Sequence, residues 1–142
     1  MVTTERVAIT VQVTINAPVD QVWKKWTTPD DIIHWCSGSA DWHTPRAEND
    51  LRVGGKFLTR MEAKDGSMGF DFEGVYNSIK TNELIEYVIG DGRKVKIEFA
   101  SSENHTEIFE TFETESTNPV EMQRSGWQTI LDNFKNYVES KK

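Results

Sequence analysis

The sequence predicts an α+β fold in which a meander of antiparallel strands is followed by one long amphipathic helix. Three observations lead to this prediction. Residues 6–15 alternate between apolar and polar side chains, which is typical of a strand with one buried face. Several apolar runs between residues 51 and 114 are separated only by short turns, which favours antiparallel pairing of neighbours. Near the carboxyl end, apolar side chains recur at steps of three and four residues: Trp127, Ile130, Leu131, Phe134 and Val138.

The strand at residues 6–15 is followed by signals for two short helices. The first begins at Pro18, because proline suits the first position of a helix. The second follows the same pattern, with Thr28 as the capping residue and Pro29 as the first residue. The apolar stripes of the two helices consist of Val22, Trp23 and Trp26, and of Ile32, Ile33 and Trp35.

Residues 37–50 predict a loop, because they have no sustained period and are rich in Ser, Gly, Asp and Pro. Trp42 lies within this expected loop. The last helix is expected to begin at Pro119, behind the cap Asn118, and to run for about 20 residues. Strands are expected near residues 51–53, 56–63, 69–79, 83–89, 93–100 and 104–114, with turns at 54–55, 65–66, 81–82, 91–92 and 101–104.

Length and composition limit the classes of function. A chain of 142 residues is expected to form one domain over residues 1–142. The net charge of -7 opposes binding to nucleic acid, and no apolar run approaches the roughly 20 residues that cross a bilayer. The single cysteine cannot form an intramolecular disulfide, and the amino terminus has no secretory-signal pattern. We therefore expect a cytoplasmic protein without membrane insertion.

A twisted sheet and a single helix are expected to leave a gap between them, because one helix cannot fill the whole concave side. Large rings, flexible methionines and Leu131 are the candidates for its lining, because most small-molecule pockets are lined by hydrophobic and aromatic side chains. The alternative is that these side chains interlock and leave no space. The candidates are Trp35, Trp42, Phe57, Met61, Met68, Phe70, Phe72, Tyr76, Tyr87, Phe99, Phe112, Trp127 and Leu131.

The stretch HWCSGSADWHTP at residues 34–45 brings together four side chains with reactive groups, His34, Cys36, Asp41 and His43. Their spacing does not match compact zinc sites, which favour paired Cys or His, so we expect no metal here. A nucleophilic Cys36 would need a base and a lowered pKa, and only a histidine is within local reach. We therefore interpret Cys36 as part of a cavity wall.

Alternation along HTEIFETFE places Glu110 on the same strand face as Phe112. If Phe112 points into the cavity, Glu110 does so too. If the register is opposite, Glu110 is solvated, and the pattern alone leaves both alternatives open. The charged side chains of Arg60, Asp71 and Glu73 fall on the face opposite to the aromatic one, so we expect them to face solvent.

Four pieces of the chain carry a family resemblance: ITVQVTINAPVDQVWKKWTTPDDIIHW, LRVGGKF, FEGVYNSIKTNELIEY and GWQTILDNFKNYVE. In this order they resemble the START-like (SRPBCC) superfamily, and within it the branch named after the activator of the 90-kDa heat-shock chaperone ATPase. The resemblance implies a helix-grip fold, in which a curved antiparallel sheet of six or seven strands wraps the carboxy-terminal helix around a cavity for a hydrophobic ligand. Members usually carry a bulky apolar residue after the tryptophan of the second helix, so Cys36 would enlarge the mouth of the cavity.

Three functions follow from the pattern and the resemblance. The first is binding of a hydrophobic or amphipathic small molecule without a cofactor or a metal. The second is an enzyme of the cyclase or hydrolase type that uses polar cavity residues such as Glu110 or His43. The third is a chaperone partner, although the chain lacks the separate amino-terminal domain of the eukaryotic activators. The sequence does not decide between a monomer and a homodimer.

Overall fold

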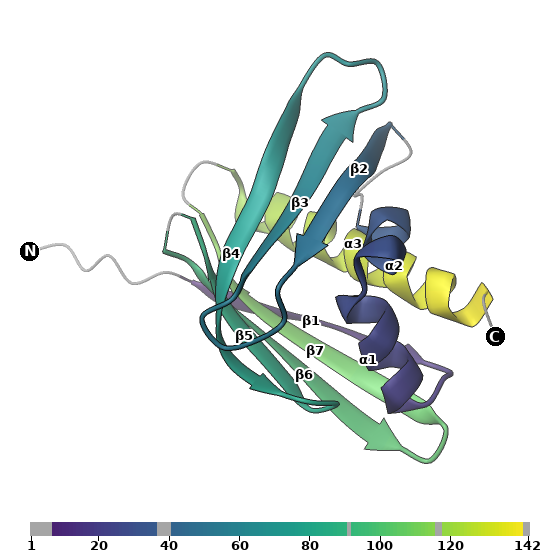
Figure 1. Cartoon of the computed structure of the whole chain (residues 1–142). Helices are drawn as coiled ribbons and strands as arrows, with labels where there is room; N and C mark the ends of the chain where they lie inside the picture. The colour runs from purple at the N-terminus through teal and green to yellow at the C-terminus, as the bar shows by residue number, and fades with distance from the viewer. Residues whose placement is uncertain (1–6, 37–40, 91, 116–117, 141–142) are drawn as a thin grey trace, which may run out of the picture.

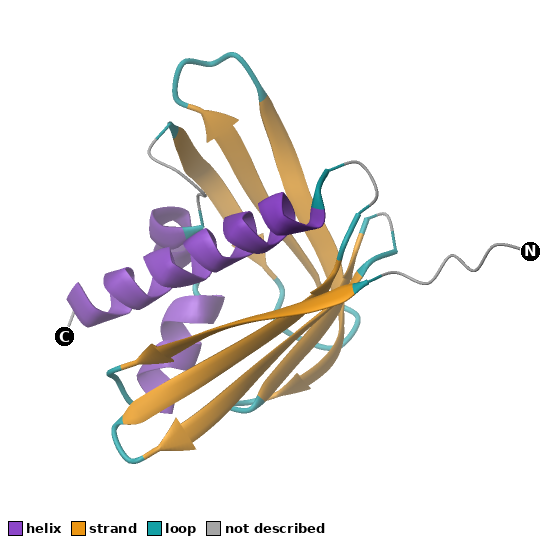
Figure 2. Cartoon of the chain, turned by 180° about the vertical axis from the view of Figure 1, so that it is seen from behind, coloured by secondary structure: helices purple, strands orange, loops and turns teal. Residues whose placement is uncertain are grey.

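The strands of the described part of the chain form one seven-stranded antiparallel sheet, and the last helix lies across its concave side (Figures 1 and 2). The computed structural model describes residues 7–36, 41–90, 92–115 and 118–140. The elements are β1 (Ala8–Ile15), α1 (Val19–Thr27), α2 (Pro29–Trp35), β2 (Trp42–Asn49), β3 (Lys56–Ala63), β4 (Gly69–Lys80), β5 (Leu84–Ile89), β6 (Lys94–Ser102), β7 (His105–Glu113) and α3 (Val120–Ser140).

The predicted α+β helix-grip architecture is confirmed, and the strands follow the order β1-β7-β6-β5-β4-β3-β2. β3 to β7 coincide with the expected strands to within about two residues at each end. The turn at 81–82 contains Asn82 with φ of 65°, a left-handed conformation that asparagine tolerates better than most residues. Of the expected turn at 91–92, residue 91 lies outside the described residues.

The prediction of a loop over residues 37–50 is wrong for the part that the structure describes. Residues 42–49 form β2, which pairs with β3 at the edge of the sheet. The pairing register shifts between His43 and Arg46, so Pro45 lies at the irregularity. An edge strand tolerates proline because its outer N–H groups need no partner in the sheet. Residues 37–40 lie outside the described residues.

The expected strand at residues 51–53 is also wrong, because these residues belong to a tight turn. The N–H of Arg52 donates to the carbonyl of Asp50, and the N–H of Gly55 donates to the carbonyl of Arg52. Gly54 has φ of 84°, which glycine adopts without steric cost. The turn thereby connects β2 to β3 instead of adding a strand.

β4 belongs to two differently oriented parts of the sheet. Its first half pairs with β3 and its second half with β5, and only Gly74 and Val75 have partners on both sides. Figure 1 shows β2, β3 and the start of β4 diverging from β5, β6, β7 and β1. The register also shifts between Tyr76 and Ser78, as expected where a strand bends. This bend makes the sheet concave.

Side chains of α3 bind the free edge of β1. Gln128 Nε2 donates to the carbonyl of Gln12 at 3.1 Å, and Lys135 Nζ donates to the carbonyl of Thr14 at 2.8 Å. A third bond runs from the N–H of Asn16 to Glu139 Oε2 at 3.0 Å. The helix is therefore fixed to one edge of the sheet by hydrogen bonds as well as by apolar packing.

The core lies between α3 and the neighbouring strands β1, β7 and β6. Its fully buried side chains alternate along the strands and recur on one face of the helix: Ile15, Ile97, Ile108, Phe112, Leu131, Phe134 and Val138. Within the described ranges, no helix has the length and apolar character needed to cross a membrane.

Candidate ligand-binding cavity

A cavity of about 290 Å³ lies between the concave face of the sheet, α3 and the end of α2. Its lining is mainly aromatic and aliphatic, with a small number of polar groups, which is the usual character of a small-molecule site. The lining residues are Trp26, Ile32, Trp35, Cys36, Glu48, Asn49, Phe57, Thr59, Met61, Phe70, Phe72, Tyr76, Ile85, Tyr87, Arg93, Glu110, Trp127 and Ile130.

Aromatic rings from β3, β4 and β5 form the sheet side of the cavity. The ring of Phe57 is central, with centroid distances of 4.7 Å to Tyr87 and 5.4 Å to Tyr76. Phe72 lies 5.6 Å from Phe57 and 6.2 Å from Trp127 of α3. These tilted and edge-to-face pairs are favourable arrangements of aromatic rings. The rings therefore support one another around the space instead of filling it.

Two tryptophans from the short helices form the opposite wall. Trp26 and Trp35 lie 4.7 Å apart, and each ring is 4.8 Å from Phe134 of α3. The indole N–H of Trp35 donates to the carbonyl of Lys25 at 3.1 Å, so its polar atom is satisfied. This wall is fixed by contacts to both neighbouring helices.

The register of β7 turns Glu110 into the cavity. Glu110 pairs with Val11 of β1 and Ile97 of β6, and only 5% of its surface is exposed. Its carboxyl has no hydrogen bond or ion pair to any residue that the structure describes, and burial raises its pKa to about 8. At neutral pH the carboxyl is therefore mainly protonated. Of the two alternatives left open by the sequence, the structure has the inward-facing one.

Two tyrosines share the cavity with this carboxyl but differ in their partners. The hydroxyl of Tyr76 donates to Asn49 Oδ1 at 2.5 Å, and Asn49 Nδ2 donates to the carbonyl of Thr27 at 2.6 Å. The hydroxyl of Tyr87 has no hydrogen-bond partner within the described ranges. Burial raises the pKa of Tyr87 well above its ordinary value, and the nearby Glu110 raises it further.

Cys36 lies in the cavity wall at the carboxyl end of α2. Its N–H donates to the carbonyl of Ile32 at 3.1 Å, so Cys36 is the C-cap residue of α2. Burial raises the pKa of the thiol to about 12, with a further contribution from Glu110. A thiol that stays protonated is a poor nucleophile, so the arrangement does not support a catalytic cysteine.

Of the four side chains with reactive groups in the HWCSGSADWHTP stretch, the three besides Cys36 do not line the cavity. His34 is exposed and stacks on Tyr137 of α3, with ring centroids 5.8 Å apart. Asp41 is exposed, and His43 lies on β2, 3.8 Å from Glu62 of β3. Within the described ranges, no three His, Cys, Asp or Glu side chains gather as a metal site would require.

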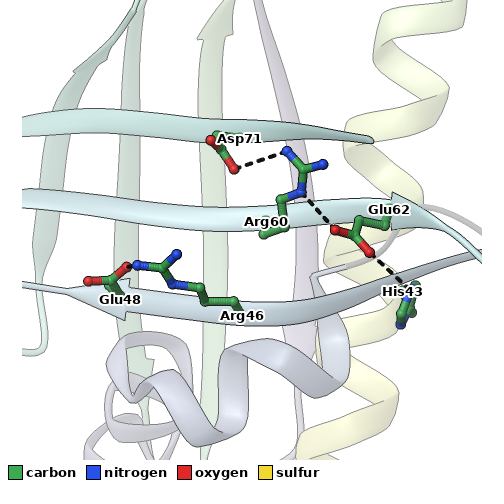
Figure 3. Close-up of polar contacts among 6 residues, drawn as sticks. All are labelled: His43, Arg46, Glu48, Arg60, Glu62 and Asp71. Carbon is green, nitrogen blue, oxygen red and sulfur yellow. Dashed lines mark hydrogen bonds and ion pairs between the residues drawn. The ribbon is translucent and has the colours of Figure 1, made fainter. Parts of the chain in front are cut away.

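Charged residues form pairs across β2, β3 and β4 (Figure 3). Arg60 Nε lies 2.9 Å from Glu62 Oε2, and Arg60 Nη1 lies 3.3 Å from Asp71 Oδ1. On β2, Arg46 pairs with Glu48. Asp71 and Glu73 are exposed and Arg60 is partly exposed. Exposed pairs of this kind contribute little to stability, so their main effect is to keep this part of the sheet polar.

Most of the predicted lining residues border the cavity: Trp35, Cys36, Phe57, Met61, Phe70, Phe72, Tyr76, Tyr87, Glu110 and Trp127. Met68 does not, and it is 63% exposed because it lies in the β3–β4 hairpin, beyond the regular alternation. Trp42 lies outside the lining as well, with its ring 5.9 Å from Phe70.

Three further predicted lining residues belong to the core instead. Phe99 packs against Trp23 of α1 at 5.2 Å. The ring of Phe112 is stacked on Trp127 at 4.3 Å, so the tryptophan separates it from the cavity. Leu131 is fully buried in the core beside α3. Side-chain periodicity predicts the face of the strand or helix on which a residue lies. It does not predict whether other side chains cover that residue and separate it from the cavity.

Some lining residues were not predicted from the sequence. Thr59 lies between Phe57 and Met61 on the same strand face, so the period of two could have identified it. Glu48 and Asn49 could not be found, because β2 itself was not predicted. The remaining additions are Trp26, Ile32, Ile85, Arg93 and Ile130.

Comparison with known proteins places the chain in a family. The family model for activator of Hsp90 ATPase homolog 1-like proteins matches residues 16–139. No curated protein sequence matches the chain. An AHSA1-like protein from Aeromonas hydrophila, solved in solution, has 42% sequence identity and a TM-score of 0.89 over 94% of this chain and 93% of its own.

Two further solved structures agree with this result. A protein from Cytophaga hutchinsonii has 56% identity and a TM-score of 0.81, over 94% of this chain and 92% of its own. A protein from Nitrosomonas europaea, with 19% identity and a TM-score of 0.83 over 96% of both chains, shares the fold. The family model over residues 16–139 and the similarity to the AHSA1-like protein from Aeromonas hydrophila show that the chain belongs to the family of activator of Hsp90 ATPase homolog 1-like proteins.

Proposed function

We propose that the protein binds a hydrophobic or amphipathic small molecule in the cavity between the sheet and α3. The observation that carries this proposal is a ring-lined space of about 290 Å³ that contains an unpaired, buried carboxyl, that of Glu110. Burying a polar group without a partner costs free energy, so a fold that needed only a solid core would favour an apolar side chain at this position. A guest in the cavity offsets this cost.

Binding is tested with N-phenyl-1-naphthylamine, a neutral probe whose fluorescence rises in an apolar site. We expect saturable binding at a single site, and we expect the variant Ile130→Trp to weaken it at least tenfold, because Ile130 lines the cavity and the larger ring occupies it. Met122→Trp is the matched control, since Met122 lies on the same helix but is 62% exposed.

Equal binding to the parent protein, Ile130→Trp and Met122→Trp would contradict a site in the cavity. Thr59→Phe is a second blocking variant, on β3 instead of α3, in case Ile130→Trp does not fold. Circular dichroism and thermal unfolding of each variant separate loss of the site from loss of the fold.

Activation of a chaperone ATPase is a second candidate, and the family match is the observation that favours it. The test adds the protein to purified Hsp90 and measures the rate of ATP hydrolysis. A stimulated rate that Ile130→Trp retains would assign the activity to the outer surface. An unchanged rate would leave ligand binding as the function.

A further inference from the structure

Three buried polar side chains of the cavity lining, those of Glu110, Tyr87 and Thr59, have functional groups without a partner in the described part of the chain. Glu110 projects from β7 and Tyr87 from β5, and β6 lies between these strands. They are near enough for a charge on Glu110 to act on the tyrosine hydroxyl. The remaining tyrosine of the lining, Tyr76, already donates its hydroxyl hydrogen to Asn49. A bound molecule therefore meets three unused polar groups, and Glu110 and Tyr87 are the pair that also act on each other electrostatically.

Both groups can donate a hydrogen bond. A tyrosine hydroxyl carries one hydrogen, and a protonated carboxyl also carries one. Glu110 retains its proton at neutral pH, because burial raises its pKa to about 8. The complementary group on a ligand is an acceptor, and a carbonyl oxygen, with two lone pairs, can accept from both donors at once.

The cavity is less suited to ions. Charging Glu110 to bind a cation would place two charges in an apolar space, and the cost of removing them from water often exceeds their mutual attraction. Binding of an anion would be opposed by the acidic group of Glu110 and by the net charge of the chain, which is -7. The other charged lining residues are Glu48, which is exposed, and Arg93, which is partly buried.

We propose that the cavity selects neutral aromatic or alicyclic molecules that carry a carbonyl oxygen, and that this oxygen accepts hydrogen bonds from the protonated carboxyl of Glu110 and from the hydroxyl of Tyr87. This inference rests on the proposed function, because it assigns a ligand class to the same cavity. It adds that the polar groups recognise an uncharged acceptor.

Four probes with one ring system separate these ligand classes: naphthalene, 2-acetylnaphthalene, 2-naphthylmethylammonium and 2-naphthoate. Each is titrated against the N-phenyl-1-naphthylamine complex between pH 6 and pH 9. We expect 2-acetylnaphthalene to bind at least 3- to 10-fold more tightly than naphthalene at pH 6, the ratio that about one net hydrogen bond supplies. The ammonium and carboxylate probes should bind more weakly than naphthalene.

The preference for the ketone should decline as the pH rises through about 8, because an ionised Glu110 has no hydrogen to donate. Other ionisable groups facing the cavity do not produce this change. The Cys36 thiol has a pKa of about 12, and burial raises the pKa of Tyr76 and Tyr87 above the ordinary tyrosine value. Glu48 and Arg93 complete the ionisable lining, and their contribution is removed by comparing the ketone with naphthalene at each pH.

Three variants assign the effect to the named groups. Glu110→Gln keeps an N–H donor, so the ketone preference should persist and become independent of pH. Glu110→Leu should abolish the pH-dependent part of the preference while naphthalene still binds. Tyr87→Phe should reduce the preference at every pH, and it remains informative if a Glu110 variant does not fold.

The outcomes distinguish this inference from the proposed function. If all four probes bind equally, or if the ammonium probe binds more tightly as the pH rises through 8, the cavity binds ligands but the inference is wrong. An undiminished ketone preference in Glu110→Leu and Tyr87→Phe would also overturn it. If none of the probes binds, the proposed function fails, and the inference fails with it.

Discussion

At the scale of single residues, Glu110 should link folding to pH. Its folded pKa of about 8 lies above the ordinary value of 4.5, so the native state holds a proton that the unfolded chain releases between these values. The stability that this proton contributes is fully present below about pH 4.5 and is lost as the pH rises through about 8. Each pH unit in this window changes the free energy of unfolding by about 1.4 kcal/mol.

We expect Glu110→Gln to be more stable than the parent at pH 8.5 by a few kcal/mol, about 2–4, because the amide does not ionise. Urea unfolding between pH 5 and pH 9 measures this difference. Glu107→Gln is the control on the same strand, since Glu107 is exposed. Parallel stability curves for the parent and Glu110→Gln would show that the carboxyl is not desolvated.

Cys36 should be inert to alkylation in the folded protein. With a thiol pKa of about 12, its thiolate fraction at pH 8 is lower than that of an ordinary cysteine by about three orders of magnitude. We expect iodoacetamide to react at least a hundredfold more slowly with the native protein than with the urea-unfolded chain. Because the chain has one cysteine, the mass increase reports this site alone. Comparable rates in the two states would place the thiol in contact with solvent.

At the scale of elements, the bend of β4 depends on the absence of a side chain at Gly74. A Cβ at this position would lie 2.5 Å from Phe57 Cε2 and 3.0 Å from the carbonyl oxygen of Val88. The ring of Phe57, which lines the cavity, would have to shift, and the backbone of β5 has less freedom to move.

We therefore expect Gly74→Ala to lower the free energy of unfolding by about 1–3 kcal/mol and to weaken probe binding, because overpacking forces neighbouring groups to shift. Chemical denaturation and the naphthalene titration measure the two effects. Gly126→Ala is the matched control on α3. A Cβ there would have no neighbour within 4 Å, and the helix should gain about 0.5–1 kcal/mol. Equal effects at the two glycines would contradict the role of Gly74.

The amino end of α3 is held by the side chain of Gln123. Its Oε1 accepts from the N–H of Glu115 at 2.9 Å, and its Nε2 donates to the carbonyls of Glu115 and Asn118 at 3.0 and 2.8 Å. We expect Gln123→Ala to destabilise the protein by about 1–3 kcal/mol, since it removes three hydrogen bonds of a buried side chain to partly buried backbone groups. Arg124→Ala removes only an exposed ion pair with Glu121 and should change stability by less than about 1 kcal/mol. Thermal unfolding compares the two variants, and a similar loss in both would contradict this account.

At the scale of the whole molecule, elements with a strong period were predictable and irregular ones were not. Val7 to Ile15 alternate, and the residues from Trp127 to Val138 recur on one helix face, so β1 and α3 follow from periodicity alone. β2 did not, because Pro45 and a shift of register interrupt its alternation. The pairing of β2 with β3 stabilises it as a strand, and that contact is not visible in the local sequence.

The same limit applies to the cavity. Alternation placed Phe57 and Met61 on the inward face correctly, but it also suggested Phe112, which lies behind Trp127. Whether an inward side chain reaches open space depends on the side chains stacked over it from other elements. For Glu110 the sequence offered two orientations of equal weight, and the pairing with Val11 and Ile97 decides between them.

The hydrogen bonds that tie α3 to this edge have a consequence for self-association: Gln128 and Lys135 donate to carbonyls of β1, and Glu139 accepts from the N–H of Asn16 just beyond it. Backbone groups on an outermost strand are the usual template by which a second chain adds itself edge to edge, and runaway addition ends in fibrils. Here α3 already occupies several of those groups, and at the far border Pro45 interrupts the row that β2 would offer. Any pairing of two copies should therefore use faces other than these borders, and the purified protein should resist fibril growth until α3 detaches.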